Sequence, residues 1–161
     1  MMRSALLFGL ALTLAAGTAT AQDHPDFSGT WKLNLIKSDA APGRGGQMGA
    51  PREVTITISQ TATELTLEQS MGENTMKSTY YLDGRESTNA NRRGETKSTA
   101  KWDGKSLVIQ GTSTFEGPNG SMTIKTKEVR TLSDDGKTMT VTTTSESPRG
   151  TNTRKTVFDK Q

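Results

Sequence analysis

The dipeptide Asp-Gly followed by a basic residue occurs three times in this chain, at Asp83-Gly84-Arg85, Asp103-Gly104-Lys105 and Asp135-Gly136-Lys137. Asp-Gly is a strong hairpin signal, because a type I′ turn needs a positive φ at both central residues and these two residues tolerate it well. Segments rich in Thr, Val and Ile surround the turns, and apolar and polar residues alternate in them. The pattern predicts a meander of antiparallel strands.

Strand-like alternation continues along most of the chain, and no segment shows a helical stripe. Residues 85–94 are polar, and their pattern is ambiguous. The segments that we expect to be strands are 27–36, 54–59, 64–68, 76–82, 98–102, 107–115, 122–132, a segment from 139 that ends before Pro148, and 153–158.

Eight or nine strands, each with one apolar face, must close or fold over to hide that face and the sheet edges. The up-and-down order favours a closed barrel over a Greek-key sandwich, in which some connections must cross. We therefore expect an all-β protein, an antiparallel up-and-down β-barrel of eight to nine strands. A barrel of this size is either just filled by side chains or holds one small ligand.

The N-terminus has the features of a signal peptide. A short positive start is followed by an apolar run from Ala5 to Ala16 and by the small-residue cleavage pattern Ala19-Thr20-Ala21. We expect residues 1–21 to be removed and residues 22–161 to form one domain, with a flexible Gly/Pro-rich loop at 37–51. The predicted protein is exported to the periplasm or the extracellular space, without a membrane segment after cleavage and, having no Cys, without disulfides.

Charge and residue types argue against several function classes. The chain has 20 basic and 17 acidic residues, and the basic residues are interspersed with acidic ones rather than gathered into the patch that a nucleic acid requires. His24 is the only His, and it precedes the first predicted strand. With one His and no Cys, neither a catalytic triad nor a zinc site can be assembled. We expect no catalytic residues, no metal and no cofactor.

The predicted interior carries two aromatic residues with polar atoms and a row of small residues. Tyr80 and Trp102 lie on faces that the alternation predicts to point inward, and each would supply an apolar wall with a polar group. Small inward residues leave volume that a ligand or water can occupy. These small residues are Ser98, Ala100, Gly111 and Ser113.

Two charged residues are in phase with the apolar face of segment 122–132. If that strand is regular, Glu128 and Arg130 point inward together with Met122 and Ile124. A buried charge must be paired, so the two would bind each other or a polar ligand. A β-bulge would instead turn both outward, and the sequence leaves this choice open.

The opening strand carries a family resemblance. Phe27-Ser28-Gly29-Thr30-Trp31-Lys32-Leu33 resembles the first strand of the calycins, the superfamily of lipocalins and fatty-acid-binding proteins. The resemblance implies that Gly29 and Trp31 seal one end of the barrel and that a late Arg, here Arg154, packs over the indole, with ligand binding as the alternative role for Arg154.

The chain departs from both families in ways that limit what the resemblance implies. The lipocalin Thr-Asp-Tyr motif is missing, and Arg154-Lys155-Thr156 stands where fatty-acid-binding proteins have Arg-x-Tyr. Segment 37–51 replaces their helical lid. Lipocalin-like architecture therefore carries over and fatty-acid binding does not, and the chain is most similar to small exported bacterial lipocalin-like proteins.

Together these features predict a monomeric exported barrel that binds a small, partly apolar molecule without transforming it. The ligand-binding residues that we expect are Tyr80, Trp102, Arg130 and Arg154. The alternative is a barrel filled by its own side chains that acts through its surface as an envelope or interaction protein.

Overall fold

The structure, a computed structural model, describes residues 24–39, 53–71, 74–91, 94–117 and 120–161. The predicted signal peptide and most of the predicted loop at 37–51 lie outside these residues. None of the described residues forms a helix that is long and apolar enough to cross a membrane. The strands are β1 (Gly29–Leu33), β2 (Val54–Gln60), β3 (Glu64–Met71), β4 (Asn74–Tyr81), β5 (Glu86–Asn91), β6 (Gly94–Asp103), β7 (Ser106–Gly117), β8 (Gly120–Leu132), β9 (Thr138–Ser147) and β10 (Gly150–Lys160).

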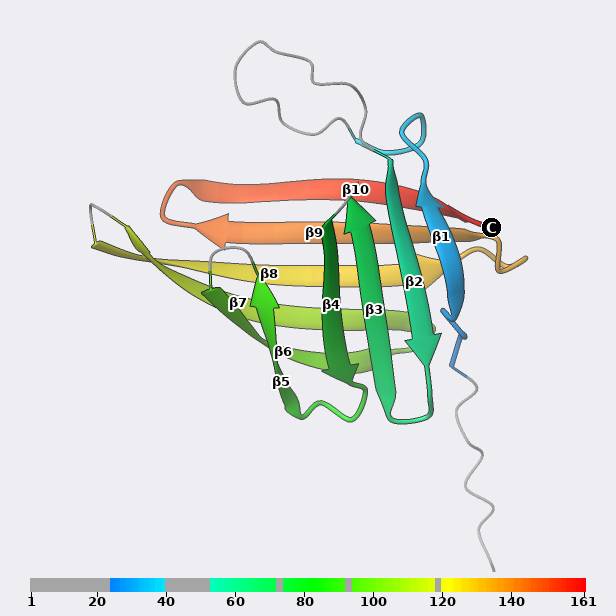
Figure 1. Cartoon of the computed structure of the whole chain (residues 1–161), viewed down its shortest axis with the longest axis horizontal. Coiled ribbons are helices and arrows are strands. Elements are labelled where there is room, and N and C mark those ends of the chain that lie inside the picture. Colours follow the sequence, from blue (N-terminus) through cyan, green and yellow to red (C-terminus); the bar gives the residue numbers. More distant parts are fainter. Residues whose placement is uncertain (1–23, 40–52, 72–73, 92–93, 118–119) are drawn as a thin grey trace, which may run out of the picture.

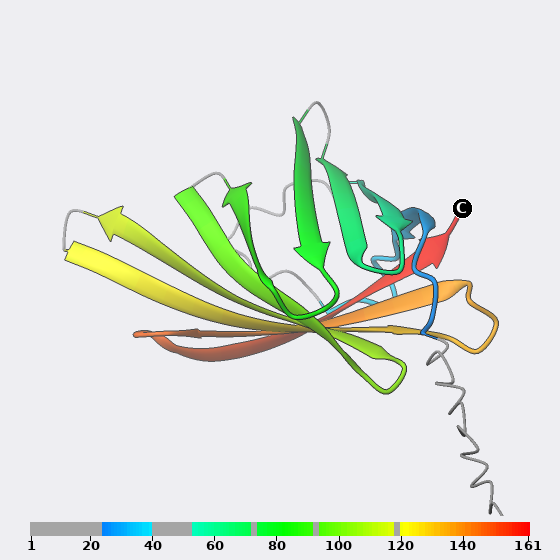
Figure 2. The same cartoon turned by 90° about the horizontal axis from the view of Figure 1, so that it is seen from below.

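All ten strands belong to one antiparallel sheet in the order β4-β3-β2-β1-β10-β9-β8-β7-β6-β5. The sheet curls so that β1–β4 lie across β7–β10, and the C-terminus ends beside β1 (Figures 1 and 2). The first and last strands pair directly, with Trp31 opposite Lys160 and Leu33 opposite Phe158. The all-β, antiparallel, up-and-down barrel is confirmed, and it is closed except between β4 and β5.

The predicted count of eight to nine strands is wrong because it omits β5. This strand occupies part of the ambiguous segment 85–94, and its sequence, Glu-Ser-Thr-Asn-Ala-Asn, contains no large apolar residue. Ser87, on its inner side, is buried and donates from Oγ to the carbonyl oxygen of Ser98 at 3.2 Å. Small polar residues therefore take the inward positions, and the apolar alternation that identifies the other strands is absent.

The Asp-Gly signals mark turns, but not the predicted type I′ hairpins. Asp103 pairs with Ser106, so Gly104 is the first of two loop residues, and its φ is 58°. No described residue other than glycine has a positive φ, which fits a type II′ turn with Gly at the first central position. At the third signal, the Gly136 N–H donates to the Ser133 carbonyl oxygen at 2.8 Å, as in a type I turn followed by a left-handed Gly. The first signal, at Asp83-Gly84, links β4 and β5 without a strand ladder.

One end of the barrel is closed by the segment that precedes β1. Phe27 and Trp31 have no exposed surface, and Trp31 Nε1 donates to the Phe27 carbonyl oxygen at 2.8 Å. The side-chain amide of Gln60 accepts a hydrogen bond from Phe27 N–H at 3.1 Å and donates one to the Pro25 carbonyl oxygen at 3.0 Å. The backbone polar groups of this segment are thereby satisfied beside the apolar core.

The residue that packs over Trp31 is Lys160, so the expectation that Arg154 does so is wrong. Lys160 Nζ lies 5.2 Å from the centre of the Trp31 ring system, within the range of a cation–π contact. Trp31 and Lys160 are directly opposite across the β1–β10 ladder. Arg154 lies six residues earlier on β10 and lines the barrel interior instead.

We predict that Trp31→Ala lowers the free energy of unfolding by about 3–5 kcal/mol, because it leaves a cavity and removes the donor to Phe27. Lys32→Ala, on the exposed side of the same strand, should cost no more than about 1 kcal/mol through its surface ion pair with Glu53. Urea unfolding followed by circular dichroism measures both. Equal effects of the two substitutions would contradict the role of Trp31 at the closed end.

Candidate ligand-binding site

Strand β8 carries Glu128 and Arg130 into the barrel. Its ladders with β7 and β9 are continuous here, with Glu128 opposite Ile109 and Thr143, and Arg130 opposite Leu107 and Val141. No bulge interrupts the register. Of the two arrangements that the sequence left open, the structure has the inward one.

Glu128 and Arg130 form an ion pair in the interior, between Glu128 Oε1 and Arg130 Nη2. Besides this ion pair, Glu128 Oε1 has no hydrogen-bond partner among the described residues. Arg130 is 5% exposed, and its Nε and Nη1 atoms have no hydrogen-bond partner among the residues that the structure describes. Because a buried charged donor without a partner is costly, the site has hydrogen-bonding capacity that the protein itself does not satisfy.

Arg154 from β10 meets this pair in a cavity of about 280 Å³. Its Nε is also buried, and no described residue forms a hydrogen bond with it. The cavity is enclosed mainly by β2, β8, β9 and β10. The other residues that line it are the apolar Leu33, Val54, Ile56, Val141 and Phe158 and the polar Gln69, Thr143 and Thr156. Two guanidinium groups and one carboxylate thus share a small space with an otherwise mostly apolar wall.

Tyr80 adjoins the charged cluster from β4. Burial is the main cause that raises the pKa of its hydroxyl, the negative charge of Glu128 raises it further, and Arg130 opposes that rise. A hydroxyl group that stays protonated can donate a hydrogen bond to an acceptor in the interior. Tyr80 does not line the cavity of Arg130 and Arg154, and a role in ligand binding remains a prediction.

Trp102 is apart from the charged cluster, at the closed end of the barrel. It stacks on His24 with ring centres 4.3 Å apart and an interplanar angle of 3°. With His24, Asp26, Gln60 and Leu82 it borders a second cavity, of about 350 Å³. Of the four predicted ligand-binding residues, the structure therefore brings Arg130 and Arg154 together, places Tyr80 beside them and separates Trp102 from them.

The row of small inward residues does not line the cavity that holds the arginines. A Cβ on Gly111 would lie 2.9 Å from Thr126 Oγ1 and 3.1 Å from Ser98 Oγ, so these small residues pack against one another. Sequence reasoning missed the cavity residues Gln69 and Thr143. Their only signal is that each falls on the inward phase of its strand, opposite Ile56 and Glu128 respectively.

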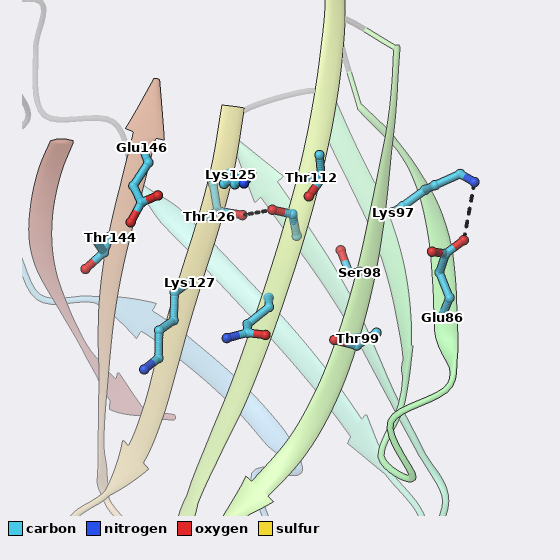
Figure 3. Close-up of a pocket in the computed structure, with 12 residues that line it drawn as sticks. Glu86, Lys97, Ser98, Thr99, Thr112, Lys125, Thr126, Lys127, Thr144 and Glu146 are labelled. Atoms are coloured by element: carbon cyan, nitrogen blue, oxygen red, sulfur yellow. Dashed lines mark hydrogen bonds and ion pairs between the residues drawn. The ribbon is translucent and has the colours of Figure 1, made fainter. Parts of the chain in front are cut away.

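A larger concave surface, of about 550 Å³, lies over β5–β9 (Figure 3). Two rows of polar side chains line it: Lys97, Thr112, Lys125 and Glu146 in one, and Thr99, Gln110, Lys127 and Thr144 in the other. The inward-pointing row of Ser98, Gly111 and Thr126 lies between them. Lys97 pairs with Glu86 at 3.4 Å. All of the charges are on exposed residues, so this groove has weaker electrostatics than the interior.

Within the part of the chain that the structure describes, no cluster of three or more His, Cys, Asp or Glu residues could hold a metal ion. The chemistry available in the interior is the binding of an acidic group, by guanidinium donors that can form paired hydrogen bonds with a carboxylate.

We predict that Glu128→Leu destabilises the protein by about 3–5 kcal/mol, because it leaves Arg130 buried without a counter-charge. The double variant Glu128→Leu/Arg130→Met should recover most of this loss, since an apolar pair of similar volume can replace a buried ion pair. Urea unfolding of Glu128→Leu, of Arg130→Met and of the double variant gives the coupling energy between the two side chains. Additive effects would show that the two side chains do not interact.

No protein-family model matches the chain, and no curated protein sequence matches it. Solved structures do. Zebrafish ileal bile acid-binding protein in complex with cholic acid superposes with a TM-score of 0.61 at 18% identity, covering 84% of this chain and 98% of its own. A REP1-NXSQ fatty acid transporter variant gives 0.60 at 16% identity, covering 84% and 98%. A variant of the fluorescent protein UnaG gives 0.56 at 21% identity, covering 84% and 96%. At these identities the likeness shows the fold alone, an antiparallel β-barrel like theirs, which agrees with the fold that the resemblance of the first strand implies.

Proposed function

We propose that this protein binds a small, partly apolar molecule with one acidic group inside its barrel and does not transform it. The observation that carries the proposal is Arg130, which is buried in the interior with two donor atoms, Nε and Nη1, that no group in the described part of the chain satisfies. An anionic oxygen of a ligand would satisfy them.

The balance of charge in the cavity favours a single negative charge on the ligand. Glu128 offsets one of the two guanidinium groups, and Arg154 leaves one positive charge in excess. A monoanion would neutralise this excess, whereas a dianion would bring a second negative charge next to Glu128. Since buried charges are stable only when paired, the site favours monoanions over neutral molecules and dianions.

The size and wall of the cavity define the rest of the ligand. A volume of about 280 Å³ equals that of about nine water molecules in the liquid, and it lies just below the usual range for drug-sized ligands. Leu33, Val54, Ile56, Val141 and Phe158 offer apolar contact. A short apolar body attached to the acidic group fits this wall.

The structural neighbours support the same class of ligand. One was solved with cholic acid, and another is named as a fatty acid transporter. Both molecules join an apolar body to an acidic group. Because identity to these proteins is 18% and 16%, they support the general class, and the ligand itself must be inferred from the cavity of this chain.

A second candidate function, interaction through the surface, is favoured by one observation. The concave outer surface over β5–β9, at about 550 Å³, is larger than the interior cavity. A barrel of this kind would bind its partner there and leave the interior without a ligand. Substitutions of inward and outward residues on the same strands separate the two functions, because they change the interior and the outer surface independently.

We predict that Arg130→Gln and Arg154→Gln each weaken binding of the anionic fluorescent probe anilinonaphthalene sulfonate by about tenfold or more, because each removes charge-assisted hydrogen bonds. Lys127→Gln and Lys155→Gln remove the same charge from the outer faces of β8 and β10 and should change affinity less than about twofold. Fluorescence titration measures all four. Equal effects of the inner and outer pairs would overturn the interior site.

Natively purified protein supplies an independent check of the same proposal. Native mass spectrometry should reveal a bound mass that is released on mild denaturation, and that is absent from Arg130→Gln prepared in the same way. Protein that carries no releasable mass and does not respond to the probe would favour the filled barrel.

Export remains part of the proposal and is supported by the signal-peptide pattern that ends at Ala21. We predict that expression in a bacterial host yields periplasmic protein whose N-terminus is Gln22. Ala21→Arg should leave the leader attached, because the cleavage site requires a small residue. Mass spectrometry of fractionated cells measures both, and full-length wild-type protein in the cytoplasm would contradict export.

A further inference from the structure

The ring of strands has one place without a ladder, between β4 and β5. These strands are consecutive in the chain, yet they are the two ends of the sheet order. By contrast, the hairpin of β7 and β8 pairs from Leu107 opposite Arg130 to Gly117 opposite Gly120. We call the line between β4 and β5 the seam.

Among the residues that the structure describes, the Asn89 side chain bridges the seam through two hydrogen bonds. Asn89 Oδ1 accepts from the Thr79 N–H at 2.8 Å, and Asn89 Nδ2 donates to the Thr79 carbonyl oxygen at 3.0 Å. The carboxamide thus takes the place of a peptide group from a paired strand. A side chain that rotates about its own bonds can release both hydrogen bonds without breaking a backbone ladder.

The seam lies next to the charged interior. Tyr80 follows Thr79 on β4, and the charges of Glu128 and Arg130 both act on its hydroxyl. On the other side, the inner position next to Asn89 is the small residue Ser87. Separation of β4 from β5 would therefore expose a path past Tyr80 toward the guanidinium groups.

We propose that the ligand passes into and out of the barrel through the seam. The Asn89 carboxamide acts as a latch: its two hydrogen bonds to Thr79 must break before the ligand passes, and this step limits the rates of association and dissociation. This inference rests on the interior binding site proposed above. Every other pair of neighbouring strands in the sheet order is held by a backbone ladder, so the barrel can open at the seam without breaking a ladder.

The test compares a cross-link across the seam with one across a ladder. Thr79→Cys/Thr88→Cys places two outer-face thiols beside the latch, and Thr114→Cys/Thr123→Cys places two across β7 and β8, where the native hydroxyl groups are 3.2 Å apart. The wild-type chain has no Cys. Each pair is joined by a short bis-maleimide, and stopped-flow fluorescence follows anilinonaphthalene sulfonate.

The seam cross-link should slow both association and dissociation of the probe by about tenfold or more while the Kd changes less than about twofold, because a barrier to passage affects both rates equally. The control cross-link should leave both rates unchanged. Asn89→Ala should accelerate both rates about threefold or more and speed hydrogen exchange at the Thr79 amide.

Wild-type affinity with unchanged rates in the seam-linked protein would overturn passage through the seam and leave the interior site intact. Equal affinities of Arg130→Gln and Lys127→Gln for the probe would overturn the interior site, and the seam proposal with it. If Asn89→Ala fails to fold, the cross-linked pair decides the question alone.

Discussion

The short antiparallel ladder between β1 and β10 makes the rest of the structure possible. It joins the first strand to the last through Trp31 opposite Lys160 and Leu33 opposite Phe158. The last residue extends it, since the Gln161 N–H donates to the Thr30 carbonyl oxygen at 2.9 Å. Without this junction a ten-stranded sheet would leave an apolar face and two further edges in water. With it, that face becomes the barrel wall, and the inward residues of the core, Glu128 and Arg130 among them, lie in an environment of low polarity.

Because charge is costly in that environment, the interior charges need an explanation. A buried ion pair is seldom more stable than apolar residues of the same volume, so Glu128 and Arg130 are not needed to hold the barrel together. Arg154 adds a second positive charge to a cavity lining whose acidic residue, Glu128, is paired with Arg130. The same strands carry Lys127 and Lys155 on their exposed sides, where charge costs little. A charged side chain costs more free energy on the inner face of these strands than on the outer face. This difference is the physical reason to assign function to the inner arginines.

Sequence reasoning predicted the architecture and only part of the site. The alternation of apolar residues and the Gly29-Thr30-Trp31 triplet were enough to predict the barrel, because both reflect the burial of one face of the sheet. Strand β5 was missed because its inward positions hold Ser87 and Asn89 rather than large apolar side chains. The turn types differed because the φ angles depend on where the two strands pair, which the dipeptide does not specify.

The site was harder to predict because it depends on register across strands far apart in the chain. Whether Glu128 and Arg130 face inward depended on the absence of a bulge, which leaves no trace in a single sequence. Lys160 rather than Arg154 covers Trp31 because of the β1–β10 register. Trp102 has the right inward phase, but it lies at the closed end against His24, and phase along a strand does not reveal depth in the barrel.

The most direct test of the account is an NMR titration that observes the arginine Nε–H groups while an anionic probe such as anilinonaphthalene sulfonate is added. Arg130 and Arg154, whose Nε atoms are buried without a hydrogen-bond partner in the described ranges, should show large shifts that saturate with binding, whereas the exposed Arg149 should not respond. Saturable binding that leaves the Arg130 and Arg154 signals in place would contradict an anion site in the interior.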